Sequence, residues 1–184
     1  MPSPPADSPD QETIARAIAG EAEAFGELYD RYLDPLYRFI RFQVTLREDA
    51  EDLTETVFLK AFERLPEFRT DKRMTNFRAW IFRIARNLVI DHYRSRKPPL
   101  PLDPEMPSGN PGDGPEFQVQ FREQSERIGR AVERLEEPFR PVIVMRFVAG
   151  LTYTETASAL GLSENYVRVI QFRALRKLKE MLEE

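Results

Sequence analysis

The chain has 184 residues, of which 41% are hydrophobic, so it is long and apolar enough to fold into one ordinary domain or two small ones. It contains no cysteine, which excludes a disulfide framework and thiol-based metal or redox chemistry. The formal net charge of −4 conceals a segregation of charge, because acidic and basic residues lie in separate segments of the chain.

Residues 1–20 form an acidic, proline-rich N-terminal segment. The first 30 residues hold seven acidic side chains and one arginine, unlike the basic and then apolar start of a secretion signal. The longest apolar cluster of the chain, PVIVMRFVAGL, is broken by Arg146 and is too short to span a bilayer. We therefore expect a soluble protein of the cytoplasm with no direct membrane insertion, and a first helix near 12–18.

Three apolar stripes with helical spacing follow in the first module, residues 21–97. Their members recur at i, i+3, i+4 and i+7, and no segment has the alternation of a strand. The stripes are Phe25, Leu28, Tyr29, Tyr32, Leu33, Leu36, Tyr37 and Ile40; Ala50, Leu53, Val57, Phe58, Ala61, Phe62 and Leu65; and Phe77, Trp80, Ile81, Ile84 and Leu88. We predict a bundle of three or four helices.

The third stripe lies in a basic segment, FRAWIFRIARNLVIDHYRSRK at 77–97. Its 21 residues include six Arg or Lys, four Phe, Trp or Tyr, and a single acid. Two interpretations compete for this pattern: an amphipathic helix whose basic face is solvated, and a surface that holds nucleic acid. Trp80 fits the apolar stripe and is interpreted as a core residue.

Residues 98–115, PPLPLDPEMPSGNPGDGP, mark a break in composition. Ten of these 18 residues are Pro or Gly, three are acidic and none is basic. Such a segment favours an extended chain. We interpret it as an acidic linker that joins two small helical modules.

The second module, residues 116–184, is also predicted to be helical. Thr152 and Glu155 match a capping box, and Ser163 is the expected cap of the last helix. The expected helices cover about 117–135, 138–148, 152–161 and 163–182. The chain is therefore assigned to the all-α class.

The segment TYTETASALGLSENYVRVIQFRALRKL has the pattern of a helix-turn-helix. Ala157 supplies the small residue where two helices touch, and Gly161 supplies the turn. Thr156 departs from the pattern, which usually has an aliphatic residue there. The apolar offsets are filled by Leu160, Leu162, Val167 and Ile170. An ordinary helical hairpin with a charged surface is the competing interpretation.

If Val167 and Ile170 point inward, the rotation of 100° per residue fixes the outward face of the last helix. The outward residues are Ser163, Glu164, Asn165, Arg168, Val169 and Phe172. Four basic residues flank this face as possible phosphate partners: Arg173, Arg176, Lys177 and Lys179. This face is where a recognition helix meets the major groove.

Both modules resemble bacterial RNA polymerase sigma factors of the sigma-70 family, in its extracytoplasmic-function group. The matching segments are LYDRYLDPLYRF, DAEDLTETVFLKAF, FRAWIFRIARNLVIDHYRSRK and RLEEPFRPVIVMRFVAGLTYTETASALGLS. The resemblance implies that residues 21–97 are sigma region 2, a helical bundle, and that residues 116–184 are sigma region 4 with its helix-turn-helix. It implies an alternative sigma factor that directs promoter-specific initiation.

In such sigma factors the helix that corresponds to residues 77–97 of this chain holds the minus-ten promoter element as the duplex opens. Cations along the DNA backbone and rings against unstacked bases suit this task. The resemblance and the helical geometry give a set that we call the minus-ten residues: Asn76, Arg78, Phe82, Arg83, Arg86, Asn87, Tyr93, Arg94, Arg96 and Lys97. The resemblance also implies that the outward face of the last helix and its basic flank read the minus-thirty-five element. We call these the minus-thirty-five residues: Ser163, Glu164, Asn165, Arg168, Phe172, Arg173 and Arg176.

The segment at 49–62 resembles the region that docks on the clamp helices of the largest polymerase subunit. The expected core-polymerase contacts are Asp49, Asp52, Leu53, Glu55 and Phe58, with Leu53 and Phe58 alternatively plain core. The family usually has Gln-Glu where this chain has Glu55 and Thr56. The expected partners are core RNA polymerase, including the flap of its second largest subunit, promoter DNA and an anti-sigma factor.

The sequence predicts neither an enzyme nor a cofactor site. The one histidine, His92, has no cysteine or carboxylate cluster with metal-ligand spacing around it, and no glycine-rich phosphate loop follows a strand. Two alternatives to a sigma factor stay open at this point. One is a repressor or activator that uses only the helix-turn-helix, and the other is a sigma-like decoy that never engages polymerase.

Overall fold

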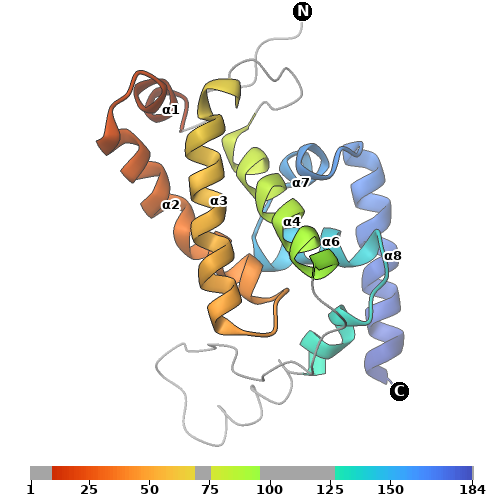
Figure 1. Cartoon of the computed structure of the whole chain (residues 1–184). Coiled ribbons are helices and arrows are strands. Elements are labelled where there is room, and N and C mark those ends of the chain that lie inside the picture. Colours follow the sequence, from red (N-terminus) through yellow and green to blue (C-terminus); the bar gives the residue numbers. More distant parts are fainter. Residues whose placement is uncertain (1–9, 69–75, 96–126, 184) are drawn as a thin grey trace, which may run out of the picture.

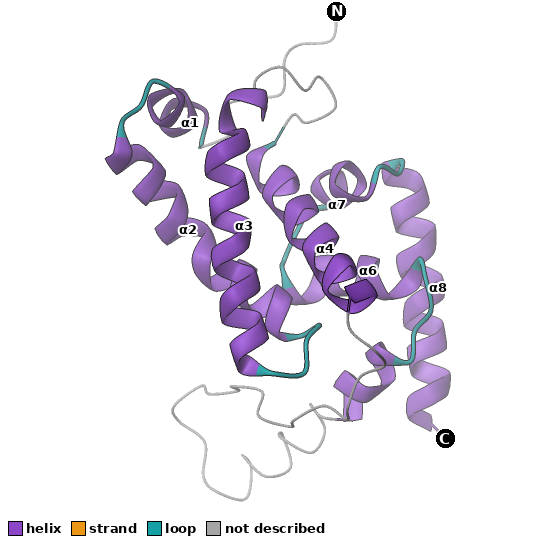
Figure 2. Cartoon of the chain, in the orientation of Figure 1, coloured by secondary structure: helices purple, strands orange, loops and turns teal. Residues whose placement is uncertain are grey.

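The computed structural model describes residues 10–68, 76–95 and 127–183, and within these ranges the chain is built from helices without a strand (Figure 1, Figure 2). The predicted all-α class is therefore confirmed. The linker at 98–115 and two of the minus-ten residues, Arg96 and Lys97, lie outside the described residues. In the described ranges, no helix combines the length and hydrophobicity that a membrane span requires.

The first module is a bundle in which three long helices bury their apolar stripes against one another, and a short helix precedes them. Phe39, Phe77 and Phe82 are among the largest fully buried side chains. Trp80 is also buried, as predicted, and its ring lies 5.5 Å from that of Phe77. The helices are α1 (Gln11–Ile18), α2 (Ala22–Arg41), α3 (Arg47–Phe68) and α4 (Phe77–Ser95).

The short helix α1 is fixed to α2 by a buried carboxylate. Asp10 is almost fully buried, accepts a hydrogen bond from the Tyr32 hydroxyl and pairs with Arg31. Burial and the neighbouring carboxylate raise the pKa of Tyr32 far above its ordinary value, so its hydroxyl stays protonated and donates. The acidic N-terminal part of the chain thus contributes Asp10 and helix α1 to the bundle, with Ile14 and Ala17 buried in its core.

The described part of the second module starts at residue 127 with helical residues 127–133 and continues through shorter elements to a long last helix; residues 116–126 of the predicted module lie outside the described residues. The predicted capping box is confirmed: the Glu155 N–H donates to Thr152 Oγ1 at 3.1 Å, and the Thr152 N–H donates to Glu155 Oε2 at 2.7 Å. The elements are α6 (Phe139–Ile143), the π-helical turn η1 (Val144–Val148), α7 (Tyr153–Leu160) and α8 (Glu164–Glu183).

The two modules pack against each other and share one apolar core. Met145 and Leu151, from around η1, are fully buried in the same cluster as the rings of the first module. In Figure 1, α4 lies between α3 on one side and α7 on the other, and both neighbours contact it. Helix α4 therefore has first-module helices on one side and second-module helices on the other.

Candidate nucleic-acid interface

The helix-turn-helix is assembled as its sequence pattern predicts. Ala157, Val167 and Ile170 are buried together with Val142 in a small core of their own. Gly161 ends α7 with φ 68°, a left-handed conformation that favours glycine, and α8 starts three residues later. This geometry holds α7 across the start of α8.

Thr156, at the position where the pattern has an aliphatic residue, is fully buried. Its hydroxyl has no hydrogen-bond partner among the residues that the structure describes. A buried hydroxyl without a partner keeps the cost of its desolvation. The departure from the pattern thus has a price in stability.

We expect Thr156→Val to raise the free energy of unfolding by about 1 kcal/mol, because valine has the same shape without the unpaired hydroxyl. Urea unfolding followed by circular dichroism measures this change. Thr156→Ser is the matched control: it keeps the hydroxyl, loses a methyl group and should lower stability. A valine variant less stable than the natural protein would contradict the account.

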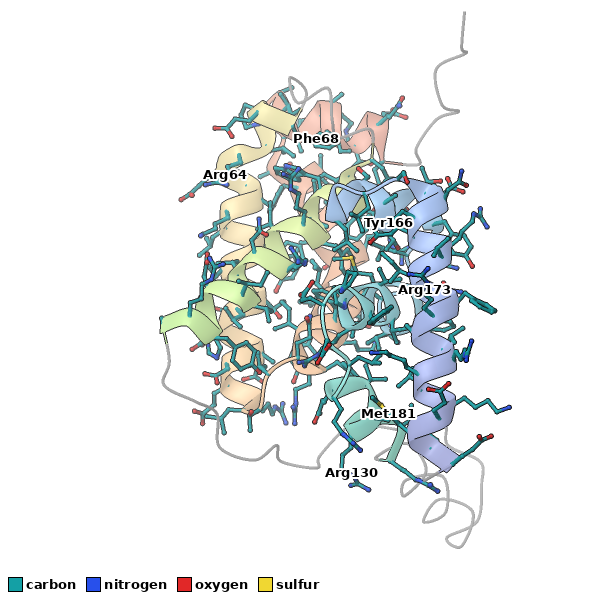
Figure 3. The ribbon with its side chains drawn as sticks, turned by 90° about the vertical axis from the view of Figure 1, so that its right-hand side faces the viewer. Arg64, Phe68, Arg130, Tyr166, Arg173 and Met181 are labelled. Atoms are coloured by element: carbon teal, nitrogen blue, oxygen red, sulfur yellow. The ribbon has the colours of Figure 1, made fainter. Side chains whose placement is uncertain are left out.

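The outward face of α8 is exposed, and Ser163 starts it by accepting a hydrogen bond from the Tyr166 N–H at 3.3 Å. Phe172 is 70% exposed, and Arg173 and Arg176 are exposed beside it. Of the minus-thirty-five residues only Glu164 is half-buried. Helix α8 runs along the edge of the molecule in both views, and Figure 3 labels Tyr166 and Arg173 on it. The predicted outward orientation is confirmed.

Sequence reasoning missed that this face also carries apolar side chains beyond Phe172. Tyr166 and Leu175 are 48% and 43% exposed, and Val169 was expected outward but not counted as a contact. Val169 and Leu175 each lie three residues from Phe172, and Tyr166 lies three residues before Val169; this spacing is the signal that could have found them. The face is therefore both basic and apolar, which suits base edges, thymine methyl groups and phosphates.

Arg168 is held in place on this face. Its guanidinium pairs with Glu164 Oε1 at 2.6 Å and lies over the ring of Tyr153 at 4.0 Å. The Thr154 hydroxyl donates to the other oxygen of Glu164 at 2.8 Å. The hydrogen bonds from Arg168 and Thr154 lower the pKa of Glu164, so the carboxylate is charged near neutral pH.

The structure corrects the prediction for two aromatic minus-ten residues. Phe82 is fully buried, with its ring 5.2 Å from that of Phe39 on α2, so it is a core residue. Tyr93 is half-buried, and its hydroxyl donates to the backbone oxygen of Gln43. The helical wheel assumed one buried face on α4, whereas α4 is packed by neighbouring helices on more than one side.

The polar minus-ten residues near the start of α4 contact the second module. Arg78 donates to the backbone oxygen of Ala149 at 2.7 Å and lies 3.7 Å from Glu155. The Asn76 amide donates to the same Glu155 at 3.3 Å. Glu155, whose side chain also completes the capping box of α7, therefore links the two modules.

Further along α4 the minus-ten residues become more accessible. Arg86 lies 3.6 Å from Glu137 of the second module and keeps about a quarter of its side chain exposed. Arg83 is half-buried, whereas Asn87 and Arg94 are exposed. The structure thus places three cations, Arg83, Arg86 and Arg94, where a nucleic-acid strand could reach them.

The structure also corrects part of the expected core-polymerase surface. Asp49 is buried and lies 3.4 Å from His92, between α3 and α4. Phe58 is buried against the ring of Tyr29, which confirms its alternative interpretation as a core residue, and Leu53 is half-buried. Of the five predicted contacts, the two exposed ones are Asp52 and Glu55.

Two other apolar residues on α3 are exposed. Leu59 is 65% exposed, and Phe62, which the apolar stripe assigned to the core, is 58% exposed. The Phe62 ring meets Phe25 of α2 edge-on at 5.0 Å. Glu55, Leu59 and Phe62 follow i, i+4 and i+7, so they form one exposed face. That spacing is the signal that sequence reasoning overlooked.

Among the described residues, no group of three or more histidine, cysteine or carboxylate side chains has the arrangement of a metal site.

The two modules match two family models. The model for Sigma-70 region 2 matches residues 28–98, and the model for Sigma-70 region 4 matches residues 131–180. The chain is 39% identical over 173 residues to the ECF RNA polymerase sigma factor BldN of Streptomyces coelicolor, a match that covers 93% of this chain and 65% of that relative. The chain thus spans about two thirds of the length of BldN.

Other relatives match over nearly their whole length. RNA polymerase sigma factor CnrH of Cupriavidus metallidurans is 33% identical, with 95% of this chain and 94% of CnrH covered. The solved structure of CnrH in complex with the cytosolic domain of CnrY superposes with a TM-score of 0.73 and 28% identity, covering 96% and 98% of the two chains. Sigma factor RpoE of Bartonella quintana, solved with the anti-sigma factor NepR, shares the fold with a TM-score of 0.66, 19% identity and coverages of 88% and 98%.

Proposed function

The chain belongs to the extracytoplasmic-function group of the sigma-70 family of RNA polymerase sigma factors, and from this premise we propose that α3, α4 and α8 divide the work of initiation. It is an alternative sigma factor, a transcription regulator and not an enzyme. Core RNA polymerase supplies the chemistry of RNA synthesis. Region 2, residues 21–97, docks on core polymerase and holds the minus-ten element, and region 4, residues 116–184, reads the minus-thirty-five element.

The outward face of α8 is the observation that carries the assignment of region 4. A capped helix-turn-helix presents a helix on which Arg168, Phe172 and Arg173 are all exposed. Arginine can bond base edges or phosphates, and an exposed ring can contact a thymine methyl group. An ordinary helical hairpin has no need of an aromatic side chain that is 70% exposed.

Binding of a labelled promoter with and without core polymerase tests this function. A sigma factor should bind promoter DNA poorly by itself and sequence-specifically once core polymerase is present. A repressor or activator should bind duplex DNA on its own. The logarithm of its binding constant should then fall with the logarithm of the salt concentration, with a slope of about −0.9 per phosphate contact. Specific binding that is unaffected by core polymerase would overturn the proposal.

Region 2 uses α4 for the minus-ten element through its accessible cations. Arg83, Arg86 and Arg94 follow the helix at spacings of three and eight residues, and Asn87 is exposed among them. Cations in such a row suit the backbone of a single strand. With Phe82 in the core and Tyr93 bonded to Gln43, α4 contributes charge and polar groups and not a stacking platform.

The exposed face of α3 is the part of region 2 that docks on core polymerase. It combines the acidic Asp52 and Glu55 with the apolar Leu59 and Phe62. An apolar centre beside charged residues is the usual composition of a protein interface. Neighbouring apolar side chains with such exposure on one helix are otherwise unfavourable in water.

We expect Phe62→Glu to weaken binding to core polymerase by roughly tenfold or more, since loss of a central aromatic contact costs about 2 kcal/mol. Titration of fluorescently labelled protein with purified core polymerase measures this affinity. Leu46→Glu is the matched control, because Leu46 is 48% exposed just before α3 and outside the docking face. An affinity unchanged by Phe62→Glu would remove this face from the interface.

The arrangement in this structure is a closed form. Arg78 and Asn76 are engaged by Glu155 and Ala149, so α7 covers the start of α4. Promoter DNA cannot reach these minus-ten residues until region 4 separates from α4. Engagement of core polymerase and promoter therefore includes an opening of the two regions.

The partners follow from the family and are core RNA polymerase, promoter DNA and an anti-sigma factor. Both solved relatives described above were captured with a second protein bound, CnrY and the anti-sigma factor NepR. We place the chain in the cytoplasm, where RNA polymerase is. Recovery of no specific protein partner from cells would count against the anti-sigma factor.

A further inference from the structure

The ring of Tyr153, the first residue of α7, lies between two arginine side chains. The guanidinium carbon of Arg146, from η1, is 4.0 Å from the ring centre, and that of Arg168, from α8, is also 4.0 Å away. At these distances each cation is attracted by the electron-rich face of the ring. One aromatic side chain thus joins three separate elements of region 4.

Hydrogen bonds restrict the Tyr153 side chain. Gln171 Nε2 donates to the Tyr153 hydroxyl at 3.0 Å, and Arg146 Nε donates to Gln171 Oε1 at 3.0 Å. Arg146 also donates to the backbone oxygen of Leu151. The capping box at Thr152 fixes the backbone immediately before the ring. The orientation of the Tyr153 side chain is therefore restricted by its neighbours.

The second arginine that the Tyr153 ring contacts, Arg168, is one of the minus-thirty-five residues. About half of the Arg168 side chain is exposed, and its guanidinium meets Glu164 at 2.6 Å. The ring covers one face of the guanidinium while the carboxylate bonds its edge, so two contacts of different kind restrict the same group. A long arginine that is ordered before binding loses less side-chain entropy when it meets a base.

We propose that Tyr153 is a positioning residue for promoter reading: it sets the orientation of the Arg168 guanidinium, and thereby the base preference at the position that Arg168 contacts. This inference rests on the proposed function. It assigns part of the specificity to α7, outside the recognition helix. Tyr153 itself need not touch DNA.

The test uses Tyr153→Leu and Tyr153→Phe in holoenzyme, with initiation measured on a promoter library randomised over the minus-thirty-five element. Phenylalanine keeps the ring under Arg168 and loses only the hydroxyl, whereas leucine keeps apolar bulk without the ring. We expect Tyr153→Leu to reduce discrimination roughly two- to fivefold at the same position that Arg168→Ala affects. Tyr153→Phe should retain the natural preference, and Tyr153→Leu should add nothing to Arg168→Ala.

A uniform loss of initiation across the library with unchanged base preference would overturn the inference, because it would make Tyr153 a packing residue only. The natural protein is the control for the proposed function. If it gives no promoter-dependent initiation, the proposed function is rejected, whereas the inference about Tyr153 is judged from the base preferences of the variants. Circular dichroism checks that each variant folds. Tyr153→Met replaces the leucine variant if leucine does not fold, with the same expected and contradicting results.

Discussion

An Asn76→Cys, Glu155→Cys variant whose two thiols are joined by a short cleavable reagent is expected to initiate no more RNA than core polymerase alone. The Asn76 amide and the Glu155 carboxylate lie 3.3 Å apart across the contact between region 2 and region 4. A covalent link there keeps α7 over the start of α4 and holds Arg78 against Ala149. The minus-ten element then has no access to this part of α4.

The chain is well suited to this experiment because it has no cysteine of its own. Cleavage of the reagent should restore the activity of the same variant, so any loss caused by the substitutions themselves is separated from the effect of closure. Each single-cysteine variant treated with the reagent is the matched control. Full initiation by the linked protein would show that the closed form is competent and would refute the required opening.

The double substitution Arg83→Ala, Arg86→Ala is expected to reduce open-complex formation about a hundredfold. Each charge-assisted contact with a phosphate is worth about 1.5 kcal/mol, and the loss of two such contacts gives roughly this factor. Binding to core polymerase should be unchanged, because both residues lie on α4 and the docking face lies on α3. Permanganate reactivity of unpaired thymines, followed at increasing holoenzyme concentration, measures the open complex.

Arg86 lies 3.6 Å from Glu137 in the closed form, so the substitution of Arg86 also removes an ion pair between the two regions. Glu137→Gln is the matched control, because it removes the ion pair without touching a minus-ten residue. Glu137 is 69% exposed, so this change should leave stability nearly unaltered. If core binding fell as much as open-complex formation in the double variant, the separation of tasks between α3 and α4 would be wrong.

The sequence was sufficient for the long helices of the first module and for the helix-turn-helix, whereas the helix expected at 138–148 is a short α-helix followed by a π-helical turn. Periodic apolar positions predicted α2, α3 and α4, and local signals such as Thr152, Glu155 and Gly161 predicted the ends of α7. These features depend on residues close together in the chain. The outward face of α8 followed for the same reason, since two buried positions fix the orientation of every other residue on a helix.

The errors lie where a helix has more than one packing partner. The assumption of one apolar stripe per helix assigned Phe82 to the open side of α4 and Phe62 of α3 to the core. Both assignments were wrong. Phe82 packs on Phe39 of α2 while region 4 covers another part of α4. Contacts such as that of Arg78 with Ala149 join residues 71 positions apart, and no local pattern predicts them.

The most direct test of the central claim is transcription in vitro by purified bacterial core polymerase on fragmented genomic DNA, with and without the protein. Mapping of the RNA 5′ ends is the readout. A sigma factor of this kind predicts new, discrete start sites that share two upstream motifs, one read by region 2 and one by region 4. Active core polymerase that yields no new start sites with folded protein would contradict the account and favour a repressor or a sigma-like decoy.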